Sequence, residues 1–278
     1  MVVLMVVLGA AVLHAVWNAM AHGVPDRLAG FALLGLSTGV IGLVAVLIVG
    51  LPPAGTWPYI VASVVLHCVY YFGLLASYEL GQFSQMYPLA RGTSPWVVAV
   101  VSIVVLHHSL AVAELAGVLL ISAGLIALVF VGRTAGRAQT GALLAAIGTG
   151  LAIAAYTVVD GIAVHKMPVI TYMGWVFMIQ GFLVPIVSLC VRGPSVFRQS
   201  RSAVLTGLGG GVVSMTAYGL VLWAQTRGTL AAIAALRETS IIFGAIIGAL
   251  FFHERFGPRR AVAAAVVVAG IILISTAD

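Results

Sequence analysis

Arg91-Gly92-Thr93-Ser94 lies inside an apolar run, and a near copy of it, Arg237-Glu238-Thr239-Ser240, lies inside another. The two stretches are 237 − 91 = 146 positions apart. The same shift carries Gly73 to Gly219, Leu74 to Leu220, Ala99 to Ala245, His107 to His253, Ala123 to Ala269 and Gly124 to Gly270. A shift that stays constant without a gap indicates an internal repeat, and a repeat decides the architecture before any single residue does.

The repeat extends upstream in a looser form. Trp17-Asn18 aligns with Tyr156-Thr157 at a shift of 156 − 17 = 139 positions. We therefore expect the two copies to cover the whole chain, with the first repeat over 1–132, a linker over 133–139 and the second repeat over 140–276.

Composition places the chain in a membrane. Of the 278 residues, 62% are hydrophobic and 7% are charged, whereas a soluble domain carries roughly 25% charged residues. The formal net charge of +6 does not indicate a nucleic-acid partner, because the basic residues lie in short gaps between apolar runs. Cys68 and Cys190 fall within apolar segments and are interpreted as packing residues. The apolar N-terminus lacks a basic region and is interpreted as a retained helix.

Ten apolar runs are long enough to span a bilayer, for which about 20 residues are needed. Backbone polar groups in hydrocarbon must be satisfied within the segment, so runs of this length predict helices. The expected spans are roughly Val2–Met20, Leu28–Gly50, Trp57–Leu80, Ser84–Leu106, Val112–Val131, Thr140–Val164, Pro168–Val191, Ala203–Gln225, Leu230–Phe252 and Arg260–Thr276.

The number of spans in each repeat predicts the topology. Ten spans in two repeats give five spans each, and an odd number makes the second repeat enter the membrane from the opposite side. The predicted fold is therefore an all-α integral membrane protein of ten transmembrane helices in two five-helix inverted-topology repeats. This architecture is typical of transporters that work by alternating access, with the binding site at the repeat interface near mid-membrane.

The distribution of Lys and Arg predicts the orientation. Gaps after odd-numbered spans hold nine of these residues: Arg27, Arg133, Arg137, Arg192, Arg198, Arg201, Arg255, Arg259 and Arg260. Gaps after even-numbered spans hold Lys166 and Arg227. Positive charge gathers on the cytoplasmic side, so both termini are expected outside.

Polar residues within the spans are costly and usually face a cavity or a partner, so they form the candidate site. In the first span, His14, Trp17 and Asn18 share one helix face. In the sixth, Tyr156 and Asp160 share a face, and Thr157 lies beside them. The alternative is that these groups form interhelical hydrogen bonds that hold the bundle together.

The third, fourth and ninth spans contribute further candidates. His67, Tyr71 and Tyr78 follow a stripe at helical spacing, with Glu79 next to it, and the two tyrosines could instead be packing or interfacial aromatics. Two Arg-Ser pairs share a face in their spans, and each Arg could pair with a carboxylate or extend to the membrane surface. These candidates are Arg91 and Ser94 in the fourth span, and Arg237, Glu238 and Ser240 in the ninth. Four of the candidates could carry a coupling proton: Asp160, Glu79, Glu238 and His14.

No catalytic, metal-binding or nucleotide-binding motif occurs in the sequence. The sequence therefore predicts neither an enzyme nor a cofactor, and no pair of histidines and carboxylates has the spacing of a metal site.

At this point the chain resembles the drug/metabolite transporter superfamily, in its ten-helix form with two EamA-type domains. The resemblance is carried by four stretches: Leu13-His14-Ala15-Val16-Trp17-Asn18, Ala155-Tyr156-Thr157-Val158-Val159-Asp160-Gly161, Pro88-Leu89-Ala90-Arg91-Gly92, and His253-Glu254-Arg255-Phe256-Gly257 followed by Gly270-Ile271-Ile272. The family tends to place a Glu after the fourth and ninth helices. Glu254 matches the second position, but His108 stands at the first, which favours a structural role for that Glu.

The resemblance implies a central cavity, an inner-membrane location and movement of small organic metabolites, often by export. Members of similar layout export amino acids, including aromatic ones. Five aromatic side chains could stack on a flat substrate: Trp17, Tyr71, Tyr78, Tyr156 and Trp223. His14, Asn18 and Asp160 could bind the polar end of a zwitterion.

Other functions remain open at this stage. An exporter of drugs or other metabolites would have the same layout. An integral-membrane enzyme acting on lipid-linked substrates would need acid–base residues that converge at one interface, whereas the carboxylates here are scattered. A passive channel would suit the polar stripes but rarely needs an inverted repeat. A monomer suffices because it carries both repeats, and a dimer is compatible with the sequence.

Overall fold

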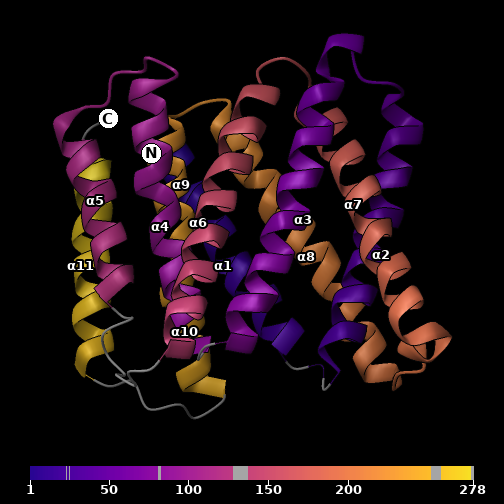
Figure 1. The fold of residues 1–278 in the computed structure, drawn as a ribbon. Coiled ribbons are helices and arrows are strands. Elements are labelled where there is room, and N and C mark those ends of the chain that lie inside the picture. Colours follow the sequence, from indigo (N-terminus) through magenta and orange to yellow (C-terminus); the bar gives the residue numbers. More distant parts are fainter. Residues whose placement is uncertain (23, 25, 81–82, 128–136, 252–257, 277–278) are drawn as a thin grey trace.

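The structure, a computed structural model, describes residues 1–278 except 23, 25, 81–82, 128–136, 252–257 and 277–278. The described residues form a helical bundle (Figure 1). Its α-helices are α1 (Val2–His22), α2 (Arg27–Val49), α3 (Trp57–Leu80), α4 (Phe83–Val104), α5 (Val112–Ala127), α6 (Arg137–Ala163), α7 (Val169–Arg192), α8 (Arg201–Gln225), α9 (Leu230–Glu238), α10 (Ser240–Phe251) and α11 (Pro258–Ser275). Two short 3-10 helices, Ala54–Thr56 and Gly193–Phe197, follow α2 and α7.

A helix lies at each of the ten predicted spans, with one correction; the expected ends at Val131 and Phe252 lie outside the described residues. The ninth span was expected to be continuous from Leu230, but it is divided at Thr239 into α9 and α10. Among the described residues, five helices are long and apolar enough to cross a membrane, and three shorter apolar helices accompany them. The chain is a multi-pass membrane protein. The predicted linker over 133–139 falls largely outside the described residues, so the division into two repeats stays a prediction there.

Helix ends follow local sequence signals. The Asp26 carboxylate caps α2 by accepting a hydrogen bond from Ala29 N at 3.2 Å, and Ser200 caps α8 in the same way. At the far ends, α2 and α7 each stop at a glycine with positive φ, Gly50 at 75° and Gly193 at 67°. Glycine adopts this conformation without the strain that a side chain would add. The helices α2 and α7, which are counterparts in the repeat, therefore both end at a glycine of the same conformation.

Helix packing follows the repeat. Counterparts pack on each other in three pairs, α2 on α7, α5 on α11, and α4 on α9. The remaining contacts come in matched sets, since α3 packs on α6 as α1 packs on α8. Both termini lie at the same end of the bundle (Figure 1). This is the contact pattern that a two-fold axis between inverted repeats produces.

Glycines bring three of these helix pairs close together. A Cβ on Gly117 of α5 would lie 2.6 Å from the Gly270 carbonyl oxygen of α11, and Gly39 of α2 leaves no room for a Cβ on Gly181 of α7. Gly207 of α8 packs directly on Leu33 of α2. Small residues let membrane helices approach closely. The glycines between positions 207 and 211 therefore serve packing, because α8 runs through them without a break.

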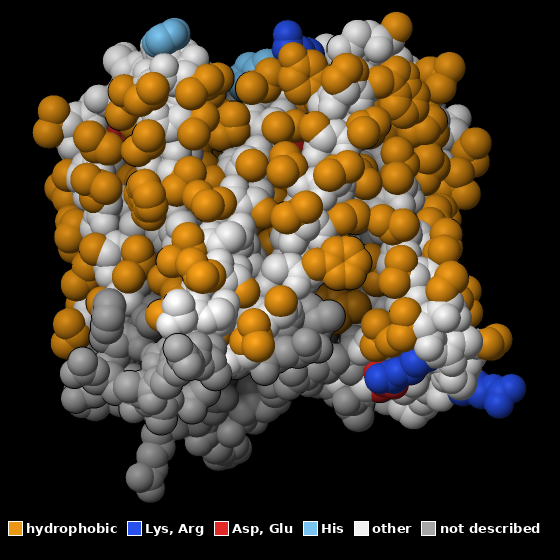
Figure 2. Space-filling view, viewed as in Figure 1, with side chains coloured by type: hydrophobic (Ala, Val, Ile, Leu, Met, Phe, Trp, Pro, Cys, Tyr) orange, Lys and Arg blue, Asp and Glu red, His pale blue; other side chains and the backbone are white. Residues whose placement is uncertain are grey.

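The outer surface is apolar over the middle of the bundle. Figure 2 shows hydrophobic side chains across most of the visible face, with the visible Lys and Arg side chains at the two ends. Exposed residues such as Val44, Leu47 and Ile48 would contact lipid. Arg192 forms an exposed ion pair with Asp26 at one end, where the charges remain in water. The interior therefore holds the polar groups that this surface lacks.

Candidate transport site

Two arginines from different repeats meet on one carboxylate. Arg91 Nη1 of α4 lies 2.9 Å from Glu238 Oε2, and Arg237 Nη2 of α9 lies 2.9 Å from Glu238 Oε1. Arg237 Nε also donates to Oε1 at 3.0 Å. The three residues are 5%, 1% and 0% exposed. A buried charge must be paired to be tolerated, and here each oxygen of Glu238 takes a hydrogen bond from a different arginine.

The arginines meet because α4 and α9 enter the bundle from opposite ends. Arg91 follows the start of α4 by about 12 Å of helical rise, and Arg237 follows the start of α9 by about 10 Å. The hydrocarbon core is about 30 Å thick. The pair therefore lies near the middle of the bilayer, at the contact between the two repeats.

The break at Thr239 lies directly beside this cluster. Thr239 N bonds to the Leu236 carbonyl oxygen at 3.2 Å, and the Thr239 hydroxyl donates to the same oxygen at 2.6 Å. This tight turn separates Arg237 and Glu238 at the end of α9 from Ser240 at the start of α10. Interrupted helices with charged residues at the break are a recurring feature of transporter binding sites.

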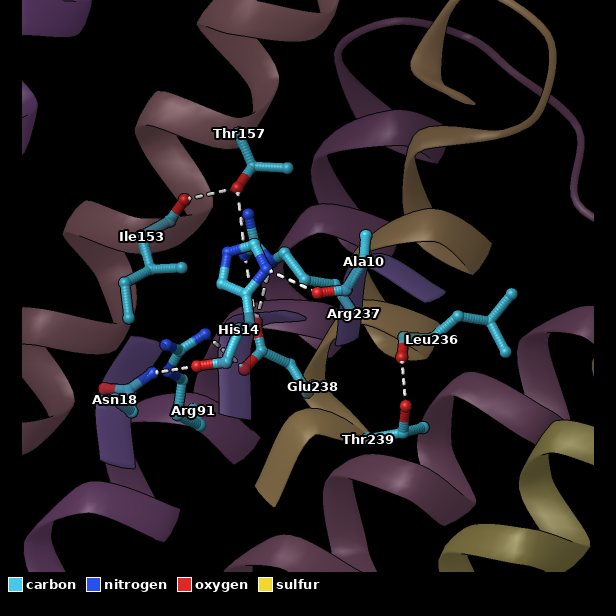
Figure 3. A network of polar contacts seen from close by, with 10 residues as sticks. All are labelled: Ala10, His14, Asn18, Arg91, Ile153, Thr157, Leu236, Arg237, Glu238 and Thr239. Atoms are coloured by element: carbon cyan, nitrogen blue, oxygen red, sulfur yellow. Dashed lines mark hydrogen bonds and ion pairs between the residues drawn. The ribbon is translucent and has the colours of Figure 1, made fainter. Parts of the chain in front are cut away.

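Residues of α1 and α6 surround the cluster (Figure 3). The Thr157 hydroxyl accepts a hydrogen bond from Arg237 Nη2 at 3.4 Å and donates to the Ile153 carbonyl oxygen. His14 bonds through Nδ1 to the Ala10 carbonyl oxygen at 2.9 Å, and Asn18 Nδ2 donates to the His14 carbonyl oxygen at 2.6 Å. The polar atoms that hold His14 and Asn18 thus belong to their own helix.

A second polar centre surrounds Asp160. The hydroxyl of Tyr172 on α7 donates to one carboxylate oxygen of Asp160, and the hydroxyl of Tyr218 on α8 donates to the other. Asp160 is fully buried. A carboxylate in such a place needs donors, and tyrosine supplies one on an otherwise apolar side chain.

Aromatic rings connect the two centres. The His67 ring stacks on Tyr156 with centroids 4.0 Å apart and meets Tyr218 edge-on at 5.8 Å. The Arg237 guanidinium lies 5.8 Å from the centroid of the Tyr156 ring. Thr157 and Asp160 stand three residues apart on α6, about 4.5 Å of rise. The paired arginines and the Asp160 carboxylate therefore lie about one helical turn apart. The rings of His67, Tyr156 and Tyr218 lie beside them and are called the aromatic wall.

The structure brings most of the predicted site residues together. Eight of them form the two centres and the wall between them: His14, Asn18, Arg91, Tyr156, Thr157, Asp160, Arg237 and Glu238. Of the carboxylates considered as partners for the arginines, Glu238 holds both. The role of these residues in transport stays a prediction.

Three buried polar atoms of predicted residues have no hydrogen-bond partner among the described residues. They are Trp17 Nε1, Ser94 Oγ and Ser240 Oγ. The Trp17 ring lies edge-on to His14 at 6.4 Å. Ser94 and Ser240 are counterparts in the repeat, and each follows its arginine by three residues. An unpartnered buried hydroxyl is costly, and the side chains of Ser102, Ser122 and Gln225 also have such an atom among the described residues.

The remaining predicted residues lie apart from these centres or outside the described part. Tyr71 flanks the wall through Tyr70, with ring centroids 5.0 Å apart, and accepts a hydrogen bond from Gln180 at 3.3 Å. Trp223 lies near the end of α8, with the Arg227 guanidinium 4.2 Å from its ring centroid. Tyr78 and Glu79 belong to α3, but their side chains lie outside the described residues, as do His253 and Glu254.

Two residues of the site were not among the sequence predictions, Tyr172 and Tyr218. His67, which shares the helical stripe of Tyr71, stacks on Tyr156. The need of Asp160 for hydrogen-bond donors was the available signal, since tyrosines in neighbouring spans are natural donors. Within the described part of the chain, no group of three or more His, Cys, Asp or Glu side chains could hold a metal ion.

Comparison with known proteins places the chain in a family. Residues 140–276 match the model of the EamA-like transporter family. The fold is also similar to that of a solved structure described only as the crystal structure of a protein, with 19% identity, 98% of each chain covered and a TM-score of 0.81. No curated protein matches the chain. The family consists of transporters and not of enzymes, and this ten-span chain, with its polar centre between two sets of helices, belongs to the EamA-like transporter family.

Proposed function

We propose that the chain is a secondary transporter that exports amino acids, aromatic or other apolar ones first, by alternating access across the inner membrane. The observation that carries this proposal is the buried pairing of Arg91 and Arg237, from two spans that enter from opposite sides, on Glu238. A charged centre at such an interface is costly in a membrane and is retained for a function. A carrier needs its site at this place, because movement of the two repeats about it exposes it to each side in turn.

The charges of the site match those of a zwitterion. A substrate carboxylate would bind the paired arginines in the planar, two-pronged geometry that guanidinium favours. An ammonium group would bind Asp160 and the faces of neighbouring rings such as Tyr156 and His67. The apolar side chain would lie along the aromatic wall. His14 and Asn18, which we expected to bind the zwitterion, would instead line the site beside the arginines.

Orientation and location form part of the proposal. Arg192 ends α7, Arg198 lies between α7 and α8, and Arg201 begins α8, all at the end of the bundle opposite to Lys166 and Arg227. Under the positive-inside rule this end faces the cytoplasm and both termini face outward. Because both arginines come from one chain, a monomer completes the site, and a dimer would add no residue to it.

Flux through proteoliposomes tests the proposal. Vesicles with purified protein would be loaded with labelled phenylalanine, leucine, lysine and glutamate, and efflux would be followed with and without an imposed pH gradient. We expect saturable efflux of phenylalanine and leucine that both Asp160→Asn and Asn18→Ala reduce. Asp26→Asn, at the exposed ion pair, is the matched control and should retain efflux.

The pH gradient separates a proton-coupled carrier from a facilitator. If Asp160 carries the coupling proton, the gradient accelerates efflux in the wild type. Asp160→Glu, which keeps a carboxylate, should retain this response, and Asp160→Asn should lose it. Absence of amino-acid flux with a folded protein would overturn the substrate assignment, and efflux of a hydrophobic drug under the same conditions would favour a drug exporter of the same family.

A further inference from the structure

The carboxylate of Glu238 has no counterpart in the first repeat. The shift of 146 positions pairs Arg91 with Arg237, but it pairs Glu238 with Gly92. The two cations are therefore duplicated and the anion between them is single. Two symmetric arginines form a site suited to the carboxylate of a ligand, and in this structure the carboxylate of Glu238 occupies that site.

The geometry of Glu238 supports this comparison. Its Oε2 accepts from Arg91 at 2.9 Å, while its Oε1 accepts from Arg237 Nε at 3.0 Å. Each oxygen thus binds the arginine of one repeat. The carboxylate of a small molecule has the same two oxygens at the same separation, so it could make the same contacts.

We propose that Glu238 is a built-in occupant of a carboxylate-binding site, and that the carboxylate of the transported molecule displaces it from between Arg91 and Arg237. This inference rests on the proposed transport function and adds the substrate class: the ligand must carry a carboxylate. A ligand with an amide or a hydrogen in place of the carboxylate lacks the negative charge needed to replace the charge of Glu238.

The chain around Glu238 allows this exchange. Glu238 is the last residue of α9, directly before the one-residue turn at Thr239 that separates α9 from α10. The hydroxyls of Ser94 and Ser240, buried and without a partner among the described residues, stand in the same two stretches of chain as the arginines. They offer an incoming carboxylate hydrogen bonds that Glu238 does not take.

Desolvation links the exchange to opening of the carrier. A carboxylate that is ionised and unpaired away from water is very costly. Glu238 already takes the contacts of both arginines, so a substrate carboxylate can make the same contacts only when Glu238 leaves them. Displaced Glu238 must meet water or take up a proton, so exchange occurs when the site is open. Glu238 would thereby let the empty carrier close, which an exporter needs in order to return.

The experiment measures binding of simple carboxylates to the purified full-length protein in detergent, so it does not depend on flux. The probes are benzoate and its neutral analogue benzamide. Glu238→Gln removes the internal competitor while keeping its shape. We expect benzoate to bind this variant about tenfold more tightly than the wild type or better, because the competent state is no longer occupied by Glu238. Benzamide should bind neither protein measurably.

A chemical rescue provides the second arm. Glu238→Ala leaves space for a small carboxylate and should lower the unfolding temperature, and acetate, but not acetamide, should restore it. Glu114 supplies the matched control, since it is a buried carboxylate that accepts a hydrogen bond from Thr229 and has no ion-pair partner among the described residues. Glu114→Ala should show no rescue by acetate.

Each outcome separates this inference from the proposed function. Equal benzoate affinity in wild type and Glu238→Gln, or rescue of Glu238→Ala by acetamide as well as acetate, would overturn the displacement of Glu238. If benzoate binding tightens while no amino acid is transported, the carboxylate site stands and the amino-acid assignment fails. If phenylalanine is transported and phenethylamine, which lacks the carboxylate, is transported equally well, transport stands and the inference fails.

Discussion

The stretches 91–94 and 237–240 are copies of each other that differ in helix geometry and in charge. Both carry a buried arginine and, three residues later, a buried serine. In the first copy α4 runs through the stretch without interruption, whereas in the second the helix breaks at Thr239. The residue after the arginine is Gly92 in one and Glu238 in the other.

Packing explains why the copies differ at this position. A Cβ on Gly92 would lie 3.0 Å from Ile126 Cγ1 and 3.0 Å from Leu125 Cβ, so residues of α5 would have to shift to admit a side chain there. Glu238 instead has a full side chain that reaches both arginines. The comparison teaches that the duplicated cation is the shared feature of the site, while its anion and its hinge belong to the second repeat alone.

Removing the Glu238 carboxylate from the second stretch, 237–240, should have the largest effect on stability. Glu238→Leu removes the carboxylate that two buried guanidiniums share, and loss of one partner from a buried ion pair costs about 3–5 kcal/mol of stability. We expect this loss in denaturant or thermal unfolding in detergent micelles. Glu114→Leu, which removes a buried carboxylate hydrogen-bonded to a threonine, should cost less. An equal cost for the two variants would contradict the ion-pair account.

Adding a side chain to the first copy should produce the next largest effect. Gly92→Ala forces α4 away from α5, and overpacking of this kind costs about 1–3 kcal/mol. Gly148→Ala is the control, because a Cβ on Gly148 of α6 meets nothing within 4 Å. Unfolding of both variants in the same detergent would compare them, and a Gly92→Ala protein as stable as Gly148→Ala would show that the first copy tolerates a side chain.

The threonines of the two stretches separate the broken helix from the continuous one. The hydroxyl of Thr239 donates to the Leu236 carbonyl oxygen at the break, and that of Thr93 donates to the Leu89 carbonyl oxygen inside α4. Thr→Val keeps the shape and removes this bond. We expect Thr239→Val to lower stability by about 0.5–1.5 kcal/mol. Thr93→Val should cost less, because Thr93 lies inside a continuous helix, whereas Thr239 forms the turn between α9 and α10. The reverse order of unfolding temperatures would argue against a structural role for the turn.

The serines should show the smallest effect on stability and the greatest similarity between the copies. Neither Ser94 Oγ nor Ser240 Oγ has a partner in the described part of the chain. Replacing either by alanine removes an unsatisfied buried hydroxyl and should therefore cause no loss of stability. If both hydroxyls bind substrate, both variants should raise the KM for phenylalanine efflux to a similar extent. A change in only one variant would confine the binding hydroxyl to one repeat.

Much of this fold could be predicted because its determinants are local or repeated. Apolar runs of spanning length mark the helices, and the recurrence of Arg91 at Arg237 marks the repeat. The break at Thr239 could not be predicted, because Glu238-Thr239-Ser240 contains no Gly or Pro, the usual signals of interruption. By contrast, α4 continues through Pro95.

The site could be predicted by residue but not by pairing. Burial of polar side chains in apolar spans identified His14, Arg91 and Asp160 as candidates. Which groups pair depends on how each helix is rotated about its axis and on contacts between distant parts of the chain. The donation from Tyr218 to Asp160 joins residues 58 positions apart, and that from Arg91 to Glu238 joins residues 147 apart. Sequence spacing along one helix does not report such contacts.

Accessibility of the paired serine positions tests the central claim, that the buried centre between the repeats opens to each side in turn. Ser94→Cys and Ser240→Cys would each be placed in a protein whose Cys68 and Cys190 are replaced by serine. A membrane-impermeant maleimide would then be applied to proteoliposomes from either face. We predict labelling from both faces, slowed when phenylalanine is added to the opposite face. Labelling from one face only, or labelling from both faces that phenylalanine on the opposite face does not affect, would contradict the account.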